Sequence, residues 1–320
     1  ARCFVRRRLR DAATPRVLVV LQRLQPPNGG FLEAPPLTAF VLMSLCACRL
    51  HDHRVAQHCA RFLCATARHD GSWPIDTNLA TWVTTLAING LAEASSHNPL
   101  ASAERASLLT LLLEQQHVTR HPFTHTAPGG WAWTNLPGSV PDADDTSGVL
   151  RALQWLAPDD ERVRAAAHAG LQWLLRLQNR DGGIPTFCRG WGALPFDRSC
   201  PDITAHAVRA WTVWRHCCTA AMQRTLQIAT RRGLRFLERA QRPDGAWIPL
   251  WFGNEKAPRH ENPTYGTAQV VLALQELENN GVKHAAGLRS AGCAWLRGAQ
   301  RADGGWGGAP HTAASLEETA

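Results

Sequence analysis

The apolar positions along the chain follow helical spacing in paired segments that are separated by short polar loops. One such segment is Val163–Leu177, and others are Asp144–Leu156 and Asp202–Trp214. Apolar residues that recur with a period of about 3.6 lie on one face of a helix, so each segment predicts a helix with a buried face. The pattern therefore predicts an all-α protein.

A short glycine-containing phrase stands between the members of each pair and occurs six times. It covers Gln25–Phe31, His69–Trp73, Ala127–Trp131, Gln178–Ile184, Gln241–Trp247 and Gln300–Trp306. Its closing residue recurs at intervals of 42 to 63 residues, a spacing typical of stacked supersecondary units. The glycine supplies the positive φ that a tight turn after a helix needs, and the following aromatic side chain can pack back over the helix ends.

Six such pairs predict a closed ring: an (α/α)6 barrel (toroid) of six outer and six inner helices that forms a single domain over residues 1–320. The inner helices are expected to begin near residues 36, 79, 144, 202, 265 and 315, and their N-termini converge at one end of the barrel. We expect the chemistry at that end. The last inner helix is expected to be truncated, because the capping box of Ser315 and Glu318 opens a helix that ends two residues later, at Ala320.

Composition narrows the class of protein. No run of about 20 apolar residues spans a membrane, and residues 1–20 lack the apolar core of a secretion signal. The ten cysteines form no CxxC pair and are expected to be reduced, as in a cytoplasmic protein. The net charge of +8 is spread over many arginines without zinc-finger spacing or basic-aromatic interleaving, so nucleic acid is not an expected partner. An anionic membrane surface suits this charge better, provided that an apolar patch accompanies it.

Three carboxylates gather at the start of the third inner helix, where Asp142, Asp144 and Asp145 follow Pro141. They can serve as an N-cap and first-turn acids, which the helix dipole favours. Three carboxylates within four residues also repel one another, which raises the pKa of one and lets it remain protonated as a proton donor. The residues alone leave both interpretations open.

The fourth inner helix opens with Asp202 and carries His206 one turn later. Asp202 can be another helix cap, and His206 can be an ordinary histidine with satisfied hydrogen bonds. As a neighbour of the three carboxylates, His206 would instead hydrogen-bond one of them, orient its proton and raise its acidity. Together the two helix starts would form an acid and the group that orients it.

The aromatic residues divide into two sets. The sequence has 13 Trp and 9 Phe but one Tyr, so its aromatic surface carries almost no hydroxyl groups. The turn aromatics fit core packing; they are Phe31, Trp73, Trp247 and Trp306. A second set stands near the acid-bearing helix starts and comprises Trp82, Trp133, Phe187, Trp251 and Tyr265. Core packing explains any one of these, but several π-faces beside a strong acid would stabilise a carbocation without reacting with it.

These motifs resemble those of a known family. The repeated QxxDGxW phrase is similar to the QW motif of triterpene cyclases, and PDADDTSGV resembles their DxDDTA motif. GGWAW, PDITAH and TYGTAQVVLAL look like further landmarks of squalene-hopene cyclases, in order from about residue 25 to 320. The resemblance implies that Asp144 is the general acid that protonates a terminal alkene, with Asp142 and Asp145 around it. It also implies that His206 is the hydrogen-bond partner of that acid and that Asp202 supports the pair.

The resemblance further implies a cavity lined by aromatic residues, with no metal and no organic cofactor. Tyr265 corresponds to a tyrosine near the acid, and the lining positions correspond to Trp133, Trp82, Phe187 and Trp251.

Three departures from the family pattern concern the substrate. Val83 stands where the family commonly carries Asp in a W-D-T triplet. The loop 188–201 is shorter than in typical members, whereas the loop 252–263 is longer.

Family members contain two barrels with the cavity between them and continue past the equivalent of residue 320. The chain is therefore expected to be a fragment of a longer two-barrel protein, with little or no activity of its own.

The resemblance implies class II, protonation-initiated cyclisation of a linear polyprene, most directly squalene to a hopene-type triterpene. A lipid substrate implies a peripheral (monotopic) protein on the cytoplasmic side of a membrane. Alternatives are a cyclase of another polyprene or prenyl diphosphate, and a non-catalytic barrel that binds an isoprenoid or a partner protein. A homodimer stays open. A zinc-dependent prenyltransferase is disfavoured, because no Asp-x-Cys pair with a distant His stands at the inner-helix ends.

Overall fold

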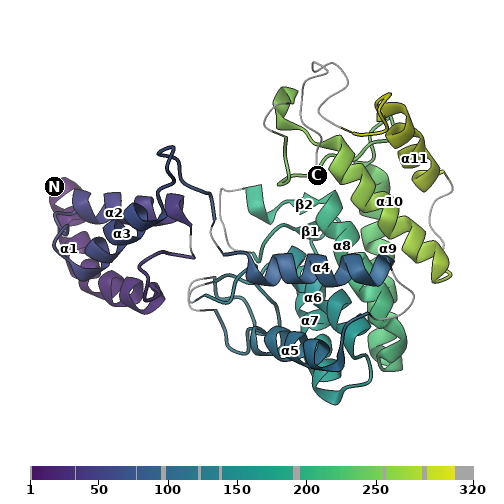
Figure 1. The fold of residues 1–320 in the computed structure, drawn as a ribbon, viewed down its shortest axis with the longest axis horizontal. Helices are drawn as coiled ribbons and strands as arrows, with labels where there is room; N and C mark the ends of the chain where they lie inside the picture. The colour runs from purple at the N-terminus through teal and green to yellow at the C-terminus, as the bar shows by residue number, and fades with distance from the viewer. Residues whose placement is uncertain are drawn as a thin grey trace. The chain divides into compact units, whose positions relative to one another are not determined.

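The computed structural model in Figure 1 describes residues 2–32, 34–76, 78–94, 99–121, 124–136, 139–189, 195–254, 257–282 and 287–306. These ranges hold eleven α-helices, three short 3-10 turns and one sheet of two short strands. The prediction of an all-α fold is confirmed.

Outer and inner helices alternate along the chain as predicted. The outer helices are α1 (Arg2–Leu24), α3 (Arg54–Thr66), α5 (Ser102–Glu114), α7 (Glu161–Leu177), α9 (Ala220–Ala240) and α11 (Leu288–Ala299). The inner helices are α2 (Pro35–Ala47), α4 (Ala80–Ala94), α6 (Ala143–Leu156), α8 (Pro201–Trp214) and α10 (Pro263–Asn279). Each of these five begins within two residues of its predicted start. The sixth inner helix, predicted near residue 315, lies outside the described residues.

The shorter elements all lie in the loops between helices. They are β1 (Ile184–Pro185), β2 (Ser199–Cys200), η1 (Pro195–Asp197), η2 (Arg215–Cys217) and η3 (Pro258–His260). The two strands pair antiparallel, with Ile184 opposite Cys200. This pairing fixes the loop that leads into α8.

The chain separates into two compact units. Unit 1 comprises residues 1–83 and 133–139, and unit 2 comprises residues 84–132 and 140–320. In unit 1, α2 and α3 pack together around a small core that includes Phe31, Leu45 and Val55, with leucines of α1 against it. The single barrel over residues 1–320 stays a prediction.

Unit 2 contains the acid-bearing helices. Its inner helices α6, α8 and α10 lie side by side, and α7, α9 and α11 pack against them from outside (Figure 1). The side chain of Asn89 on α4 donates to the carbonyl of Gly148 on α6 at 3.1 Å, so α4 continues this inner row. The largest completely buried side chains are tryptophans, among them Trp211 and Trp214. This packing fixes the inner helices whose first turns carry the acids.

The glutamine of the turn phrase ties successive outer helices together. Nε2 of Gln178, just after α7, donates to the carbonyls of Gly182 in the turn and Ala229 in α9, at 2.8 and 2.9 Å. Gln241 makes the equivalent pair of bonds to Gly245 and to Leu288 in α11. The glutamine of the third turn, Gln116, was not predicted, because a longer loop separates it from the glycine of that turn.

The glycine and aromatic positions of the turns also behave largely as predicted. Each of the six turns has a glycine with positive φ, namely Gly29, Gly71, Gly129, Gly182, Gly245 and Gly304. The indole N–H of Trp247 donates to the carbonyl of Leu237 at 2.8 Å, and Trp306 bonds Leu296 in the same way. Trp73 also bonds its helix, at Leu63, but 48% of the residue is exposed. Its assignment to the core is therefore wrong.

No disulfide joins the cysteines in the described ranges. None of the helices in the described ranges combines the length and apolar character that crossing a bilayer requires.

Candidate active site

The first turn of α6 is shaped by a short backbone ladder. The amide of Asp142 donates to the carbonyl of Trp131 at 2.9 Å, and Asp142 also pairs antiparallel with Phe187. The extended backbone at Asp142 suits an N-cap, and its Oδ1 accepts the amide hydrogen of Asp145 at 2.8 Å. The N-cap interpretation of Asp142 is thus correct, and it fixes the direction in which the next residues project.

Asp144 and His206 meet between α6 and α8. Nδ1 of His206 lies 2.8 Å from Oδ1 of Asp144, within hydrogen-bond distance. Only 18% of the Asp144 side chain and 16% of the His206 side chain are exposed. The structure therefore brings together the carboxyl group and the imidazole that the sequence singled out from residues 62 positions apart.

The other two carboxyl groups of the cluster belong to Asp142 and Asp145, which are both buried. Burial raises the pKa of Asp142 from an ordinary 3.8 to about 8, and the negative charge of Asp144 adds to this shift. Burial also raises the pKa of Asp145 well above its usual range, with further repulsion from Asp142 and Asp144. Both groups therefore favour the protonated, neutral form at neutral pH, which leaves Asp144 as the partly accessible acid.

Asp202 lies in the first turn of α8 and is buried. Its Oδ1 accepts a hydrogen bond from the thiol of Cys200 at 2.7 Å. Burial raises the pKa of Asp202 to about 6, and the charge of Asp144 contributes to the rise. Cys200 was not predicted as part of the site, since nothing in the sequence distinguishes it from the other small apolar cysteines except its place two residues before Asp202.

An aromatic cluster stands beside the ladder at Asp142. The rings of Phe187, Phe196 and Trp251 contact one another edge to face, with centroids 5.0 to 5.3 Å apart. The backbone bridge between Asp142 and Phe187 places this cluster next to the start of α6. Phe196 was not predicted, because it reaches the cluster from the irregular loop before β2.

Tyr265 lies in the first turn of α10, where its ring packs against Phe252 with centroids 5.0 Å apart. Burial raises the pKa of the Tyr265 hydroxyl, and the charges of Asp144 and Asp202 raise it further. The phenol therefore stays neutral and lies close enough to the acids to be affected by their charge.

Trp82 and Trp133 belong to unit 1. The amides of Thr81 and Trp82 lie 3.1 and 3.4 Å from the carbonyl of Trp133, so the two tryptophans are held by the same short backbone contact. Their place at the acid stays a prediction.

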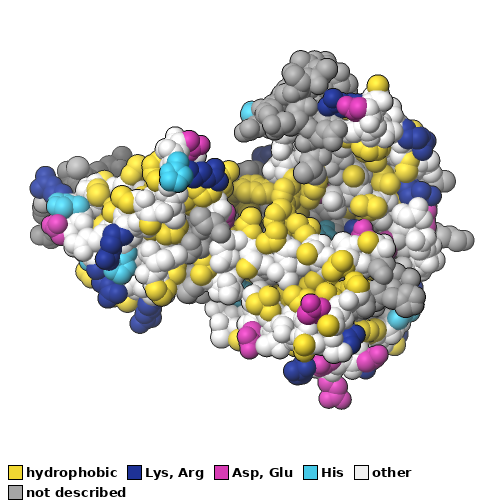
Figure 2. Space-filling model, viewed as in Figure 1, with side chains coloured by type: hydrophobic (Ala, Val, Ile, Leu, Met, Phe, Trp, Pro, Cys, Tyr) yellow, Lys and Arg dark blue, Asp and Glu magenta, His cyan; other side chains and the backbone are white. Residues whose placement is uncertain are grey.

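In the described ranges, no group of three or more His, Cys, Asp or Glu side chains has the arrangement of a metal site. Apolar side chains gather on the surface over α4 (Figure 2), where Leu86 and Leu91 are exposed.

The comparisons with known proteins agree with this geometry. Residues 79–319 match the family model described as the squalene-hopene cyclase C-terminal domain. The chain belongs to the squalene-hopene cyclase family. The match includes the inner helices α6, α8 and α10 and every residue of the acid cluster.

The names of the relatives within this family state different products. The chain is 26% identical over 299 residues to the squalene-hopene cyclase of Alicyclobacillus acidocaldarius, which covers 83% of this chain and 43% of that protein. It is 30% identical over 263 residues to the drimenyl diphosphate synthase of Streptantibioticus cattleyicolor, covering 80% of this chain and 44% of that protein. The chain thus spans less than half the length of these relatives.

Among solved structures, a glycosyl hydrolase of family 88 from Bacteroides vulgatus shares the fold. Its TM-score is 0.52 at 13% identity, and the match covers 93% of this chain and 86% of that one. Similarity at this identity concerns the fold alone.

Proposed function

We propose that the protein to which this chain belongs is a class II terpene cyclase that starts ring closure by protonating an alkene, with Asp144 as the acid. The observation that carries the proposal is the 2.8 Å contact between Asp144 Oδ1 and His206 Nδ1. Family membership supports it, because the matched region contains both residues.

The chemistry demands an unusually strong acid, because an alkene is a very weak base. In its protonated form His206 donates from Nδ1 to Oδ1 of Asp144, which leaves the other carboxyl oxygen of Asp144 to carry the proton that is transferred. The proton moves from that oxygen to the terminal alkene carbon, and the positive charge moves to the neighbouring carbon. The neutral forms of Asp142 and Asp145 place no further negative charge next to the cation.

The growing cation then needs stabilisation without a nucleophile. The three rings of Phe187, Phe196 and Trp251 present π-faces and edges but no hydroxyl group. Trp82, Trp133 and Tyr265 are proposed to extend this lining. The cascade would end with loss of a proton or capture of water.

The substrate we propose is squalene, converted to a hopene-type triterpene, as the name of the Alicyclobacillus relative suggests. A second candidate is a prenyl diphosphate, which is favoured by the 30% identity to a drimenyl diphosphate synthase over 80% of this chain. In both reactions Asp144 would protonate the alkene at the far end of a folded polyprene.

A squalene-like substrate is dissolved in lipid, so we also propose that the protein docks on the cytoplasmic side of a membrane as a peripheral protein. The net charge of +8 and the exposed Leu86 and Leu91 on α4 support such docking.

The test is to incubate the full-length gene product with squalene and, separately, with prenyl diphosphates, and to analyse the lipids by mass spectrometry. We expect one of these substrates to give a cyclic product, and Asp144→Asn to abolish it. Asp159→Asn is the matched control, since that carboxylate is 91% exposed and pairs with Arg164 at the surface. Equal product from wild type and Asp144→Asn would refute the role of Asp144.

A further inference from the structure

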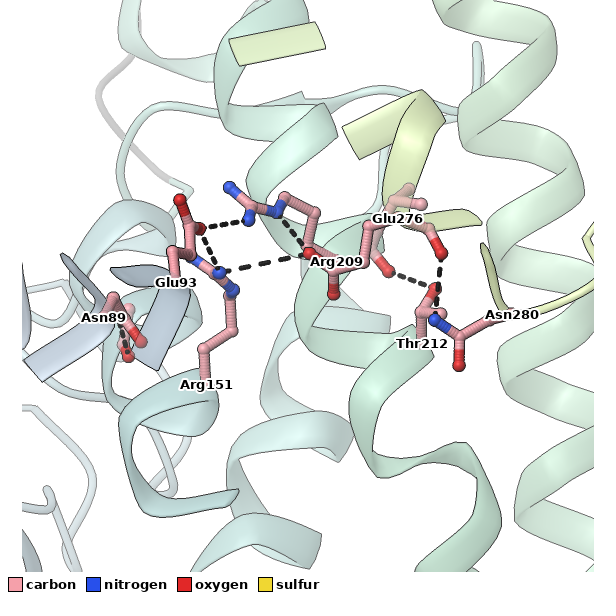
Figure 3. Close-up of polar contacts among 9 residues, drawn as sticks. Asn89, Glu93, Arg151, Arg209, Thr212, Glu276 and Asn280 are labelled. Carbon is pink, nitrogen blue, oxygen red and sulfur yellow. Dashed lines mark hydrogen bonds and ion pairs between the residues drawn. The ribbon is translucent and has the colours of Figure 1, made fainter. Parts of the chain in front are cut away.

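An ionic network joins four consecutive inner helices of unit 2 (Figure 3). Arg209 on α8 donates from Nη2 to Oε1 of Glu93 on α4 at 2.5 Å and from Nε to Oε2 of Glu276 on α10 at 2.7 Å. Arg151 on α6 donates to the same Oε1 of Glu93 at 2.8 Å and lies 3.9 Å from Glu276. We call these four residues the ionic network.

Three of the four side chains in the ionic network are largely shielded from water. Only 8% of the Arg209 side chain, 12% of the Arg151 side chain and 19% of the Glu276 side chain are exposed, whereas Glu93 is 48% exposed at one edge of the network. Burial raises the pKa of Glu93, but the hydrogen bonds and charges of Arg209 and Arg151 together outweigh it and lower that pKa. The Glu93 carboxylate therefore remains charged beside the two arginines.

Stability alone is a poor reason for such an arrangement. The free energy needed to remove charged groups from water offsets most of the attraction between them. Proteins in which apolar side chains of similar volume replace such groups are often as stable. Nε of Arg151 and Oε1 of Glu276 have no hydrogen-bond partner among the described residues. Unpaired buried polar atoms lower the net contribution of the network to stability further. Charged side chains that form hydrogen bonds differ from apolar ones in that their contacts are directional. Directional contacts fix the position of one helix along the axis of the next.

The helices that the ionic network connects are those that carry the acid pair. Arg209 follows His206 by three residues on α8, and Arg151 follows Asp144 by seven residues on α6. With a rise of 1.5 Å per residue, the network lies roughly one to two helical turns below the pair. The helices α6 and α8 are thus tied at two levels, by the Asp144–His206 contact and by the network.

The helices α4, α6 and α8 are closely packed between the ionic network and the acid pair, so a displacement of one helix affects its neighbours. A Cβ atom on Gly148 of α6 would lie 3.0 Å from the hydroxyl oxygen of Thr85 on α4 and 3.7 Å from Cε1 of His206 on α8. The backbone of Gly148 also accepts the Asn89 hydrogen bond from α4. No side chain at Gly148 is available to cushion a displacement of α8 relative to α6.

Resting on the proposed function, we propose that Arg209 is a positioning residue for the acid: through Glu93 and Glu276 it holds α8 in the register that keeps His206 against Asp144. A slide of about 1 Å would change the length or the alignment of the 2.8 Å contact and so weaken the hydrogen bond. Errors of this size at a catalytic group lower rates by about 100-fold. The side chain of Arg209 donates to Glu93 and Glu276, so its effect on the acid is indirect.

The test combines kinetics with a direct observation of His206 in the full-length protein. We expect Arg209→Met to lower kcat by about 10- to 100-fold with little change in KM, because the proposed role of the network is to position the acid and not to bind substrate. Glu276→Gln, which keeps the side-chain shape, should fold and show a smaller loss, roughly three- to tenfold. In nitrogen-15 NMR spectra, the Nδ1 signal of His206 should lose its hydrogen-bond shift in both variants.

Arg289→Met is the matched control. Arg289 forms a 2.8 Å ion pair with Glu278 in the same unit, between α10 and α11, and neither helix carries Asp144 or His206. It should leave both kcat and the His206 signal unchanged.

A lower melting temperature with unchanged kcat and unchanged His206 signal in Arg209→Met and Glu276→Gln would overturn the proposal, since the network would then be structural only. A lower kcat with an unchanged His206 signal would overturn it too. The NMR comparison requires no turnover, so a failure of the proposed cyclase activity is distinguishable from a failure of the positioning role.

Discussion

The thiol of Cys200 connects the start of α8 to the loop that carries Trp251. Its hydrogen is donated to Oδ1 of Asp202 at 2.7 Å, and its sulfur accepts the amide hydrogen of Leu250 at 3.0 Å. Both Cys200 and Asp202 are buried. One small side chain thus links Asp202 at the start of α8 to the residue that precedes Trp251 in the aromatic cluster.

Replacing Cys200 by alanine should cost about 1–3 kcal/mol of unfolding free energy, because the carboxyl of Asp202 and the amide of Leu250 both lose a buried partner. Cys200→Ser keeps a donor and an acceptor and should cost less. Urea unfolding followed by circular dichroism measures the difference. Cys217→Ala, at an exposed thiol, is the control and should change little. Equal stability of Cys200→Ala and the wild type would contradict the linking role.

Local features of the fold could be predicted because they repeat. Each turn needs a glycine with positive φ, and a periodic apolar pattern precedes and follows it, so the starts of α6 and α8 were found from neighbouring residues alone. The caps of these helices, such as Asp142, are also local in sequence. The meeting of Asp144 with His206 then follows from two adjacent parallel helices.

Contacts set by loops could not be predicted in this way. Phe196 reaches Phe187 and Trp251 through an irregular segment whose path no periodicity fixes. Cys200 acquires its role from a loop amide 50 residues later in the chain. Gln116 performs the function of the turn glutamine but stands outside the spacing of the phrase, because a loop separates it from Gly129.

The burial of Asp142 predicts a specific pH dependence of stability. Its pKa is about 8 in the folded chain and 3.8 ordinarily, so the folded state holds an extra proton between these values. This contribution is fully present below about pH 4 and is lost as the pH rises through about 8. The unfolding free energy should therefore fall toward pH 8, at up to about 1.4 kcal/mol per pH unit for this proton.

Asp142→Asn tests this dependence. Asparagine keeps the N-cap hydrogen bond and has no proton to lose, so its cost relative to wild type should shrink or reverse between pH 5 and pH 8. Urea unfolding at each pH unit gives the comparison. Parallel curves for the two proteins would show that Asp142 does not carry the extra proton.

The turn glutamines should differ in their contribution to stability. Gln178→Ala removes two buried hydrogen bonds, to Gly182 and Ala229, and should cost about 1–3 kcal/mol because both carbonyls are left without that donor. The matched control is Gln300→Ala, which removes one exposed bond to Gly304 and should cost less than about 0.5 kcal/mol. Thermal and urea unfolding of both variants measure the contrast, and similar losses would mean that the link between outer helices adds nothing.

The aromatic cluster predicts how product formation responds to loss of a π-face. Trp251→Leu removes the indole that contacts both Phe187 and Phe196. Because Trp251 is half-exposed, a cation–π contact there contributes about 0.5–1 kcal/mol, so the rate of cyclisation should fall by roughly two- to fivefold, with more product from early termination. Trp251→Phe keeps a π-face and should recover most of the rate. Gas chromatography with mass spectrometry of the lipid extract measures both the rate and the products.

The control for Trp251 is Trp73, which is equally exposed at 48% but stands in a turn of unit 1, where its indole bonds the carbonyl of Leu63. Trp73→Leu therefore removes the same ring from a structural position, and it should lower the melting temperature without altering the ratio of products. A change in product ratio in Trp73→Leu, or an unchanged ratio in Trp251→Leu, would contradict a cation-stabilising role for the cluster. Since both substitutions delete an indole of equal exposure, general loss of apolar surface cannot account for a difference between them.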